Sequence, residues 1–566
     1  MCLAAYAGAA SAAPAARPAG DPWWQHAVIY EIYLRSFQDS NADGVGDLNG
    51  ITQRLDYLAS LGVDAIWITP FFPSPQIDFG YDVADYEGVD PRFGTLADFD
   101  RLVAEARKRQ IRVLVDLELN HTSDQHQWFQ DAARSRRSLT HDLYVWSSGK
   151  PDAAGKRRPP NNWVSVFGGS AWEYVPAVEQ FYYHRYFRQE PDLNWRNPKV
   201  ERSMADVMRF WLDRGVAGFR LGAVTALVED ARLRDAAPLG GRNAQGDPNL
   251  SDTYTNNLPE THAVLRRLRK MLDHYPGEPV LIGETYVKSA AQLSAWYGGA
   301  RHDELQLPMD TAFGFATRLD AREFRRRLTE ASAELRGSQP LLLLDNHDHP
   351  RSWDRFGDGT HNTEIAKVLA TLLCTSRAAL LLYQGEEIGQ STSTPARVED
   401  VRDPIGITGW PAEKGRDGER TPMQWDASAQ AGFTASARPW LPVSPGYATT
   451  NVQAQRSESE SLLNWYRQLI ALRRGDEALR SGRLVMLDPA NLRVLSYARV
   501  TPDGSGIIVS LNMSAQAQTV TLSTLAAGLA GTRFRTLLSS PGEFSVVAPG
   551  TRLTLPPYGA WVAAVE

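Results

Sequence analysis

Cysteine, single-sign charge and long apolar runs are all scarce in this chain, and each scarcity excludes a class of protein. The only cysteines are Cys2 and Cys374, so no disulfide framework holds the fold together. No apolar run approaches the roughly 18 residues that a membrane-spanning helix requires. The 60 basic and 66 acidic residues give a net charge of −6 without a long run of either sign. We therefore expect no membrane span and no nucleic-acid partner.

The amino terminus differs in composition from the rest of the chain. The first 20 residues are rich in alanine and end in Pro and Gly, as the end of a secretory signal peptide does, but a basic start is missing. We assign residues 1–21 to a disordered leader or a signal remnant. A signal remnant would make the protein periplasmic or secreted, and a plain leader would leave it cytoplasmic.

Short apolar runs alternate with amphipathic helical segments along most of the chain, a pattern typical of parallel βαβ units. We predict an α/β fold, a (β/α)8 TIM barrel with an inserted subdomain after strand 3 and a C-terminal antiparallel β-sandwich. The barrel would comprise residues 22–121 and 191–481, the inserted subdomain 122–190, and the sandwich 482–566. The eight predicted barrel strands are 27–33, 64–69, 111–117, 216–221, 279–283, 305–309, 340–344 and 378–383.

A loop after the first predicted strand carries oxygen-bearing residues at alternate positions. The pattern matches the first nine positions of a calcium loop, in which the seventh position contributes a backbone carbonyl. The terminal bidentate Glu of an EF-hand is absent, and no helix precedes the loop. The loop is therefore either a structural Ca²⁺ or Mg²⁺ site or a plain Asx-turn loop. The predicted ligands are Asp39, Asn41, Asp43, Val45 and Asp47.

Polar residues gather where the predicted barrel strands end. A single acidic residue at such a place is more often a salt bridge or a helix cap. Several of them indicate one shared site, because the carboxyl ends of barrel strands converge. Paired carboxylates among many aromatic residues favour glycosidic chemistry, which needs an acid and a second carboxylate. The residues are Asp116, His121, Arg220, Glu284, His347 and Asp348.

Together these motifs resemble the α-amylase family of retaining glycoside hydrolases, and within it the oligosaccharide-acting α-glucosidase branch. The resemblance covers roughly residues 22–566. The family motifs are Asp116-Leu-Glu-Leu-Asn120-His121, Gly218-Phe-Arg220-Leu-Gly222, Ile282-Gly-Glu284 and Asp345-Asn-His347-Asp348. The branch motifs are Glu190-Pro-Asp-Leu-Asn194, Asp78-Phe-Gly-Tyr81-Asp82 and the segment from Gly415 to Trp425.

The resemblance implies a role for each matching residue. Glu284 corresponds to the general acid/base and Asp348 to the carboxylate that stabilises the transition state. Asp116 corresponds to a supporting residue. The remaining matches correspond to residues that hold the sugar or orient the nucleophile: Asp78, Tyr81, His121, Arg220, His347 and Arg416. The loop from Asp39 to Asp47 resembles the metal site of the branch, and no organic cofactor is implied.

Gly222 departs from the family, which has the nucleophilic aspartate at this position. Retention requires two carboxyl groups roughly 5–5.5 Å apart, and one of them is missing here. Glu229 and Asp230 follow the strand, where a helix should carry them away. We therefore expect a small void beside Gly222 and almost no hydrolysis. The simpler alternative is a glycine required by a tight turn with positive φ.

Three interpretations of the function remain open. The first is an exo-acting α-glucosidase for maltose, short malto-oligosaccharides and aryl α-glucosides, with transglucosylation, whose nucleophile was replaced by design to give a nucleophile-less or glycosynthase-type variant. The second is a natural, catalytically dead homologue that binds a sugar or a partner. The third is an isomerase like trehalose synthase. Ala223 directly follows the nucleophile position. A small residue at this position resembles the sequence of the α-1,4-acting members of the branch.

Overall fold

The structure is a computed structural model that describes residues 21–335, 337–522, 527–542, 549–550 and 552–566. Eight parallel strands form a barrel in the order β13-β12-β9-β3-β2-β1-β15-β14. A parallel bridge between Met309 and Leu341 joins the two ends of this order. The predicted TIM barrel is confirmed. Its strands are β1 (Val28–Ile32), β2 (Ala65–Ile68), β3 (Arg112–Glu118), β9 (Gly218–Gly222), β12 (Val280–Gly283), β13 (Leu307–Pro308), β14 (Leu341–Leu343) and β15 (Ala379–Tyr383).

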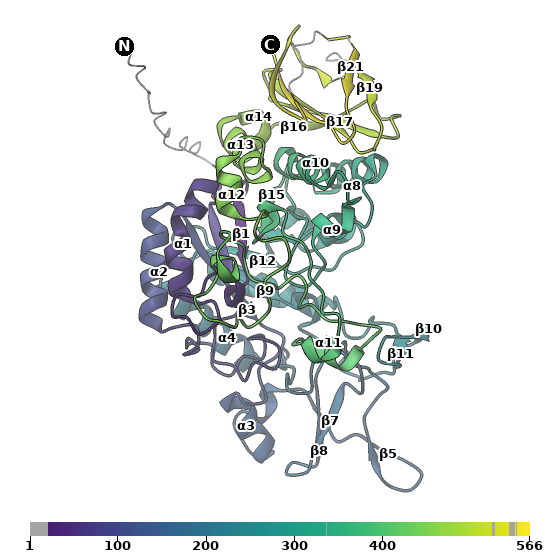
Figure 1. The fold of residues 1–566 in the computed structure, drawn as a ribbon. Coiled ribbons are helices and arrows are strands. Elements are labelled where there is room, and N and C mark those ends of the chain that lie inside the picture. The colour runs from purple at the N-terminus through teal and green to yellow at the C-terminus, as the bar shows by residue number, and fades with distance from the viewer. Residues whose placement is uncertain (1–20, 336, 523–526, 543–548, 551) are drawn as a thin grey trace.

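Amphipathic helices surround the barrel, as Figure 1 shows for α1, α2, α4, α8 and α10. Local sequence sets where they begin: Thr95 and Asp98 form a capping box at α2, and Asn197 caps α4 ahead of Pro198. The longer helices are α1 (Leu48–Leu61), α2 (Leu96–Lys108), α4 (Pro198–Asp213), α5 (Pro259–Leu272), α8 (Ala321–Glu334), α10 (Asn362–Thr375) and α13 (Leu462–Gly475). The shorter ones are α3 (Gln127–Arg134), α6 (Ala290–Ala295), α7 (Thr311–Gly314), α9 (Ser352–Phe356), α11 (Pro404–Gly409), α12 (Val452–Ser457) and α14 (Glu477–Arg480).

The segment between β3 and α4 forms the lower lobe in Figure 1, away from the carboxyl-terminal sheets. Its three-stranded sheet has the order β4-β8-β7, and an aromatic core that includes Trp163, Trp172 and Phe181 lies against it. A hairpin within residues 230–255 packs Leu250 against this core. The strands are β4 (Trp146–Ser147), β5 (Lys150–Pro151), β6 (Arg157–Arg158), β7 (Trp172–Val175), β8 (Gln180–Tyr183), β10 (Pro238–Arg242) and β11 (Pro248–Leu250).

Two antiparallel sheets follow the barrel and enclose a separate apolar core. The five-stranded sheet has the order β16-β17-β18-β22-β20, and β19 pairs with β21. Alternating patterns at 493–498, 506–511, 518–521, 533–537 and 559–565 predict β17, β18, β19, β20 and β22, whereas β16 and β21 were not predicted. Their bounds are β16 (Arg483–Leu487), β17 (Val494–Val500), β18 (Gly506–Asn512), β19 (Gln518–Thr521), β20 (Phe534–Ser540), β21 (Arg552–Leu555) and β22 (Ala560–Val565).

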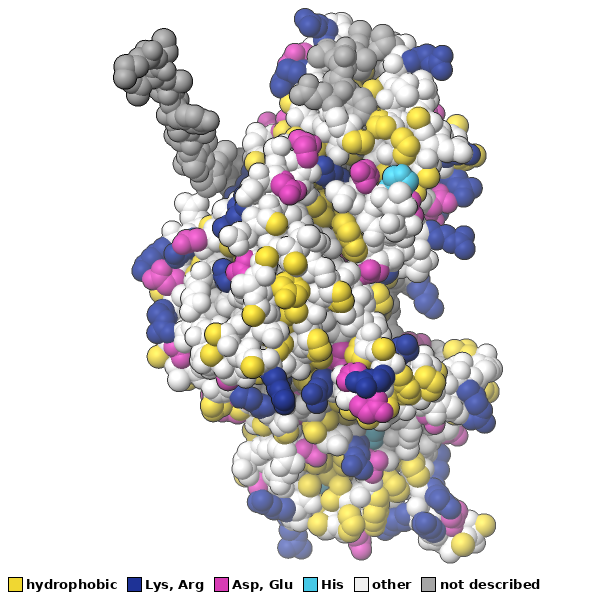
Figure 2. Space-filling view, in the orientation of Figure 1, with side chains coloured by type: hydrophobic (Ala, Val, Ile, Leu, Met, Phe, Trp, Pro, Cys, Tyr) yellow, Lys and Arg dark blue, Asp and Glu magenta, His cyan; other side chains and the backbone are white. Residues whose placement is uncertain are grey.

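Basic and acidic side chains are interspersed over the face of the molecule that Figure 2 shows. Cys374 is a free, buried thiol in α10. In the described part of the chain, no helix is both long and apolar enough to cross a membrane. The predicted leader lies outside the described residues except for Asp21.

Candidate active site

The barrel brings the predicted catalytic residues together at the carboxyl ends of its strands. In the parallel register of β3 and β9, Asp116 lies beside Arg220 and Glu118 lies beside Gly222. Arg220 is in turn the register partner of Ile282 on β12, two residues before Glu284. Side chains on one face of a strand alternate with a period of two, so Asp116 and Glu118 point to the same side. The convergence predicted from the sequence is therefore present.

Arg220 links two carboxylates at the centre of the site. It is almost fully buried, and it donates to Asp116 Oδ1 over 3.1 Å and to Glu284 Oε1 over 2.5 Å. The backbone N–H of Ala223 donates to Glu284 Oε2 over 3.0 Å, and the Tyr286 hydroxyl donates to Oε1 over 3.2 Å. Both carboxylate oxygens of Glu284 are thus held, which fixes the direction in which this side chain faces.

Ala223 presents that N–H group because of its own backbone conformation. Its φ of 46° lies in the left-handed region, which a residue with a Cβ atom seldom adopts. The turn to the short helix η3 (Val224–Ala226) begins here. Gly222, by contrast, has no left-handed φ, since the positive-φ glycines include Gly218 but not Gly222. The alternative that Gly222 serves a positive-φ turn is wrong.

Glu118 occupies the space beside Gly222, where we expected a void. A Cβ atom built on Gly222 would lie within 3.0 Å of Glu118 Oε2, nearer than real Cβ atoms come to other atoms. The expected void is therefore absent, because Glu118 reaches Gly222 from the neighbouring strand. Glu229 and Asp230 instead pair with Arg196 and Arg234.

Glu118 is held at one oxygen and free at the other. Its Oε1 accepts the backbone N–H of Asn120 over 2.9 Å, and among the described residues no donor forms a hydrogen bond with Oε2. Burial raises the pKa of Glu118 to about 8, with a further contribution from the negative charges of Glu284 and Asp116 and a partial offset from Arg220. Burial likewise raises the pKa of Asp116 to about 6, against the effect of Arg220.

Asp348 lies among guanidinium groups on the opposite side of the site. Its Oδ1 accepts from Arg420 over 2.7 Å and from Arg416 over 3.3 Å. Burial opposes ionisation of Asp348, but the neighbouring His347 ring and these two guanidinium groups hold its pKa well below the usual range. Arg416 also donates to Asp78 over 2.6 Å and to Asp403 over 2.8 Å. Arg416, which the sequence predicted to contact the sugar, therefore joins three carboxylates.

Tyr81 and the two histidines are hydrogen-bonded among these groups. The Tyr81 hydroxyl donates to Asp116 Oδ2 over 2.9 Å and lies 2.8 Å from His347 Nε2. The other ring nitrogen of His347 lies 2.6 Å from Glu31 Oε1. His121 Nε2 lies 3.3 Å from the carbonyl oxygen of Tyr81, and burial lowers the pKa of His121 to about 3. His121 is therefore a neutral hydrogen-bonding group at physiological pH.

The predicted metal loop forms a series of turns that are closed by its own side chains. Asp39 Oδ1 accepts the N–H groups of Asn41 and Ala42, and Asp43 Oδ1 accepts the N–H of Val45. Asp47 caps the start of α1. These bonds fit the Asx-turn interpretation, and within the described residues no group of three or more His, Cys, Asp or Glu side chains is arranged to hold a metal ion. In this conformation the loop side chains are not arranged to coordinate a cation, and the metal site stays a prediction.

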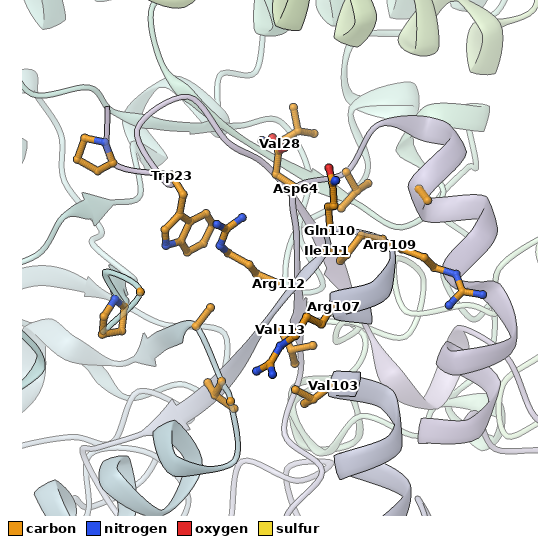
Figure 3. Close-up of a pocket in the computed structure, with 18 of the residues that line it drawn as sticks. Trp23, Val28, Asp64, Val103, Arg107, Arg109, Gln110, Ile111, Arg112 and Val113 are labelled. Carbon is orange, nitrogen blue, oxygen red and sulfur yellow. Dashed lines mark hydrogen bonds between the residues drawn. The ribbon is translucent and has the colours of Figure 1, made fainter. Parts of the chain in front are cut away.

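A hollow of about 1180 Å³ lies at the amino ends of the barrel strands, opposite the site described above. Figure 3 shows Arg112 against the ring of Trp23, with Arg107 and Arg109 from the end of α2 nearby. The guanidinium carbon of Arg112 is 4.6 Å from the Trp23 ring centroid. In TIM-barrel enzymes the amino-terminal face serves stability, and chemistry occurs at the other face. We therefore place no catalytic residue in this hollow.

Comparison with known proteins agrees with the geometry. Residues 31–482 match the alpha amylase catalytic domain, and residues 484–562 match the C-terminal domain of maltogenic amylase. The chain belongs to the α-amylase family. It is 41% identical to a probable alpha-glucosidase of Rhizobium meliloti over 88% of this chain and 90% of the relative. It is 38% identical to an oligo-1,6-glucosidase of Parageobacillus thermoglucosidasius over 87% and 90% of the two chains.

Solved structures of this family superpose on nearly the whole chain. The alpha-glucosyl transfer enzyme XgtA has 39% identity and a TM-score of 0.87, with 97% of this chain and 100% of that chain covered. The trehalulose synthase MutB from Pseudomonas mesoacidophila has 35% identity and a TM-score of 0.86 over the same shares. Proteins named as glucosidases, as a glucosyl transfer enzyme and as a trehalulose synthase are thus all similar to this chain.

Several residues of the site were not predicted from the sequence. Glu118 lies inside the motif from Asp116 to His121, but the motif predicts no role for it. A glutamate two residues after Asp116, in an otherwise apolar strand, was the available signal. Tyr286 could have been found from its spacing after Glu284, whereas Arg420 and Asp403 come from the long loop after β15, whose path no sequence pattern indicates.

Proposed function

We propose that this chain is an exo-acting α-glucosidase that retains configuration and acts on α-1,4-linked glucosides. Its substrates would be maltose, short malto-oligosaccharides and aryl α-glucosides. The observation that carries the proposal is the position of Glu284, whose two oxygens are held by Arg220 and Ala223 at the carboxyl end of the barrel. The α-glucosidase and oligo-1,6-glucosidase names of the relatives support the same substrate class.

In this proposal, Glu284 protonates the glycosidic oxygen as the bond breaks and later removes a proton from the acceptor. Asp348 is anionic and clamps sugar hydroxyls, which favours the distorted ring of the transition state. The pair of Asp78 and Arg416 holds the non-reducing end and closes that side of the site. Tyr81 lies beneath the ring, and His121 and His347 hydrogen-bond to the sugar.

Residue 222 itself forms no bond to the sugar in this proposal, because glycine has no side chain. If residue 222 were the only possible source of the nucleophile, this chain would hydrolyse almost no substrate. That is the behaviour expected of a nucleophile-deficient α-glucosidase. Replacement by design and natural loss of activity both imply intact sugar binding without turnover. The position of Glu118 beside Gly222 favours a third interpretation, in which a neighbouring strand supplies the carboxylate.

Glucosyl transfer is a second candidate activity. The superposition on XgtA and on trehalulose synthase supports it, since transfer and isomerisation both require an acceptor other than water. Incubation with maltose and with sucrose, followed by separation of products, tests the two activities: glucose alone indicates hydrolysis, and new disaccharides or trisaccharides indicate transfer. Trehalose from maltose would indicate the trehalose synthase-like alternative.

The proposal is tested with an aryl α-glucoside and the matched variant Glu284→Gln. We expect the parent to release the phenol and the variant to lose about 10² to 10⁴ in kcat/KM, the usual contribution of a general acid. The variant should still bind maltose in calorimetry. Equal rates for the two proteins would contradict the role of Glu284, and no binding of any α-glucoside by either would contradict the proposed function.

We also propose a structural Ca²⁺ or Mg²⁺ in the loop from Asp39 to Asp47. Alternating carboxylate and amide oxygens are the ligands that these hard cations prefer. The side chain of Asp43 is exposed, and a rotation there would free oxygens for the ion. The ion would stabilise the loop that precedes α1 and would take no part in the reaction.

A further inference from the structure

The side chain of Glu118 and the missing side chain of Gly222 complement each other. The two residues are register partners on adjacent parallel strands, and both lie at the carboxyl ends. Glu118 is 3% exposed, and its Oε2 lies inside the space that a Cβ atom on Gly222 would need. Its distance from that Cβ position is about the distance between the Cβ and Oδ atoms of a single aspartate. A carboxylate oxygen therefore lies next to the position that the family reserves for its nucleophile.

We propose that Glu118 is the catalytic nucleophile of this chain, supplied from β3 in place of a side chain at residue 222. The proposal rests on the proposed α-glucosidase function and deepens it. The chain is then neither a hydrolase that has lost its nucleophile nor a pure binding protein. It is a retaining enzyme whose nucleophile has moved to the neighbouring strand.

The length of the side chain fits this placement. Adjacent strands lie about 4.7–4.9 Å apart, so a carboxylate on β3 needs extra reach to arrive in front of β9. Glutamate has one methylene more than aspartate, and the glycine leaves its path open. The backbone conformation of Gly222 would allow a residue with a side chain. Because Glu118 already fills the adjacent space, any such side chain would displace it.

Hydrogen bonding prepares one oxygen of Glu118 for attack. The N–H of Asn120 holds Oε1 at 2.9 Å, which orients the carboxylate, and Oε2 is left without a hydrogen-bond donor among the described residues. A nucleophilic oxygen must keep a lone pair free in the direction of the anomeric carbon. Arg220 Nη1 would be 3.0 Å from a Cβ atom at Gly222, so a guanidinium group borders the same space.

The charges around Glu118 set its protonation. The N–H of Asn120 and the guanidinium of Arg220 favour its anionic form, and the charges of Glu284 and Asp116 disfavour it. With burial as the main cause, the pKa of Glu118 is about 8. Attack requires the anion, so the acid limb of kcat/KM should lie near pH 8.

The reaction then balances in two steps. Glu118 Oε2 donates an electron pair to the anomeric carbon, the glycosidic C–O bond breaks, and Glu284 gives its proton to the leaving oxygen. A β-glucosyl ester of Glu118 results. Water or an acceptor hydroxyl next attacks the same carbon, Glu284 takes its proton, and the ester bond breaks to release Glu118 as a carboxylate. Two inversions leave the product in the α configuration.

Covalent labelling tests the proposal directly. The parent chain is incubated with 5-fluoro-α-glucosyl fluoride, quenched in acid during turnover and digested with trypsin. We expect one fluoroglucosyl group on the peptide 113–134, and fragmentation should place it on Glu118 and not on Asp116, which lies in the same peptide. A label on Asp116, or on any residue outside this peptide, would overturn the proposal.

A set of variants separates the proposal from the function on which it rests. Glu118→Gln keeps the shape and should lower kcat/KM about 10³-fold or more without weakening the binding of maltose. Glu118→Asp keeps the charge, but its shorter side chain places the carboxylate farther from Gly222. Its kcat/KM should therefore fall by about the same factor. In Glu118→Ala, azide should restore turnover and give the β-glucosyl azide, because the azide enters the vacated space. Unchanged rates in Glu118→Gln or Glu118→Asp would overturn the proposal.

The double variant Glu118→Ala with Gly222→Asp completes the cycle. It returns the carboxylate to β9 and should recover activity, whereas Gly222→Asp alone should not, because its carboxylate would meet that of Glu118. If the parent is inactive and the double variant is active, the proposal for Glu118 fails, whereas the α-glucoside site and the role of Glu284 in it stand. If neither protein labels, hydrolyses or transfers any α-glucoside, both fail.

Discussion

Replacement of Glu118 by glutamine should make the protein more stable, by an amount that depends on pH. Burial raises the pKa of Glu118 from 4.5 to about 8 in the folded chain. Between these values the native state holds a proton that the unfolded chain has released, so the stability of the parent falls as pH rises. For a single site, this cost is about 3 kcal/mol at pH 7 and about 1 kcal/mol at pH 5. Glutamine does not titrate and keeps an oxygen for the N–H of Asn120.

The assay is urea denaturation of the parent and of Glu118→Gln at pH 5 and pH 7. We expect the stability advantage of the variant to grow by about 2 kcal/mol between the two pH values, with equal m-values. Glu399→Gln, at an exposed position, controls for the effect of the amide itself. An advantage that does not change with pH would refute the reasoning, since it would mean that Glu118 ionises alike in both states. Replacement of a catalytic residue commonly raises stability and lowers activity.

Three further predictions concern other parts of the site. Arg416→Lys keeps the charge but loses the fork that joins Asp78 and Asp348, so KM for maltose should rise about tenfold with a smaller change in kcat, measured by initial rates. Ala223→Val should shift the ratio of kcat/KM from maltose towards isomaltose, and an unchanged ratio would contradict the role of this residue in linkage preference. Chelation with EDTA should lower the Tm by several degrees and Ca²⁺ should restore it, whereas Asp43→Ala should remove the effect; a Tm insensitive to chelation in the parent would leave the loop as a plain Asx-turn loop.

The barrel could be predicted from the sequence because each strand is a short apolar run that ends at a polar residue. All eight predicted runs coincide with observed strands to within a few residues, including the weak run around Leu307. The alternation with helices defines the parallel order, and the convergence of Asp116, Arg220 and Glu284 then follows from barrel geometry. The two missed strands, β16 and β21, lie in the carboxyl-terminal sheets, where short strands carry weaker patterns.

The environment of Gly222 could not be predicted in the same way. The sequence shows which side chain is missing at residue 222, but what fills the space depends on the register of β3 against β9. That register pairs Gly222 with Glu118, a residue more than 100 positions away along the chain. The contacts of Arg416 and Arg420 depend on the path of a long loop, for which composition gives no rule. The hydrophobic pattern of the sequence assigns residues to strands, whereas the tertiary packing of strands and loops determines which residues lie in the same site.

The configuration of the first product tests the central claim most directly, because it reports the mechanism without any variant. The parent chain is given an aryl α-glucoside in an NMR tube, and the anomeric proton of the released glucose is followed before mutarotation. We predict α-glucose as the first product, from two inversions at a carbon that Glu118 attacks and Glu284 assists. Release of β-glucose would mean a single displacement by water, and no release of glucose or transfer product would mean that Gly222 leaves the site without a nucleophile.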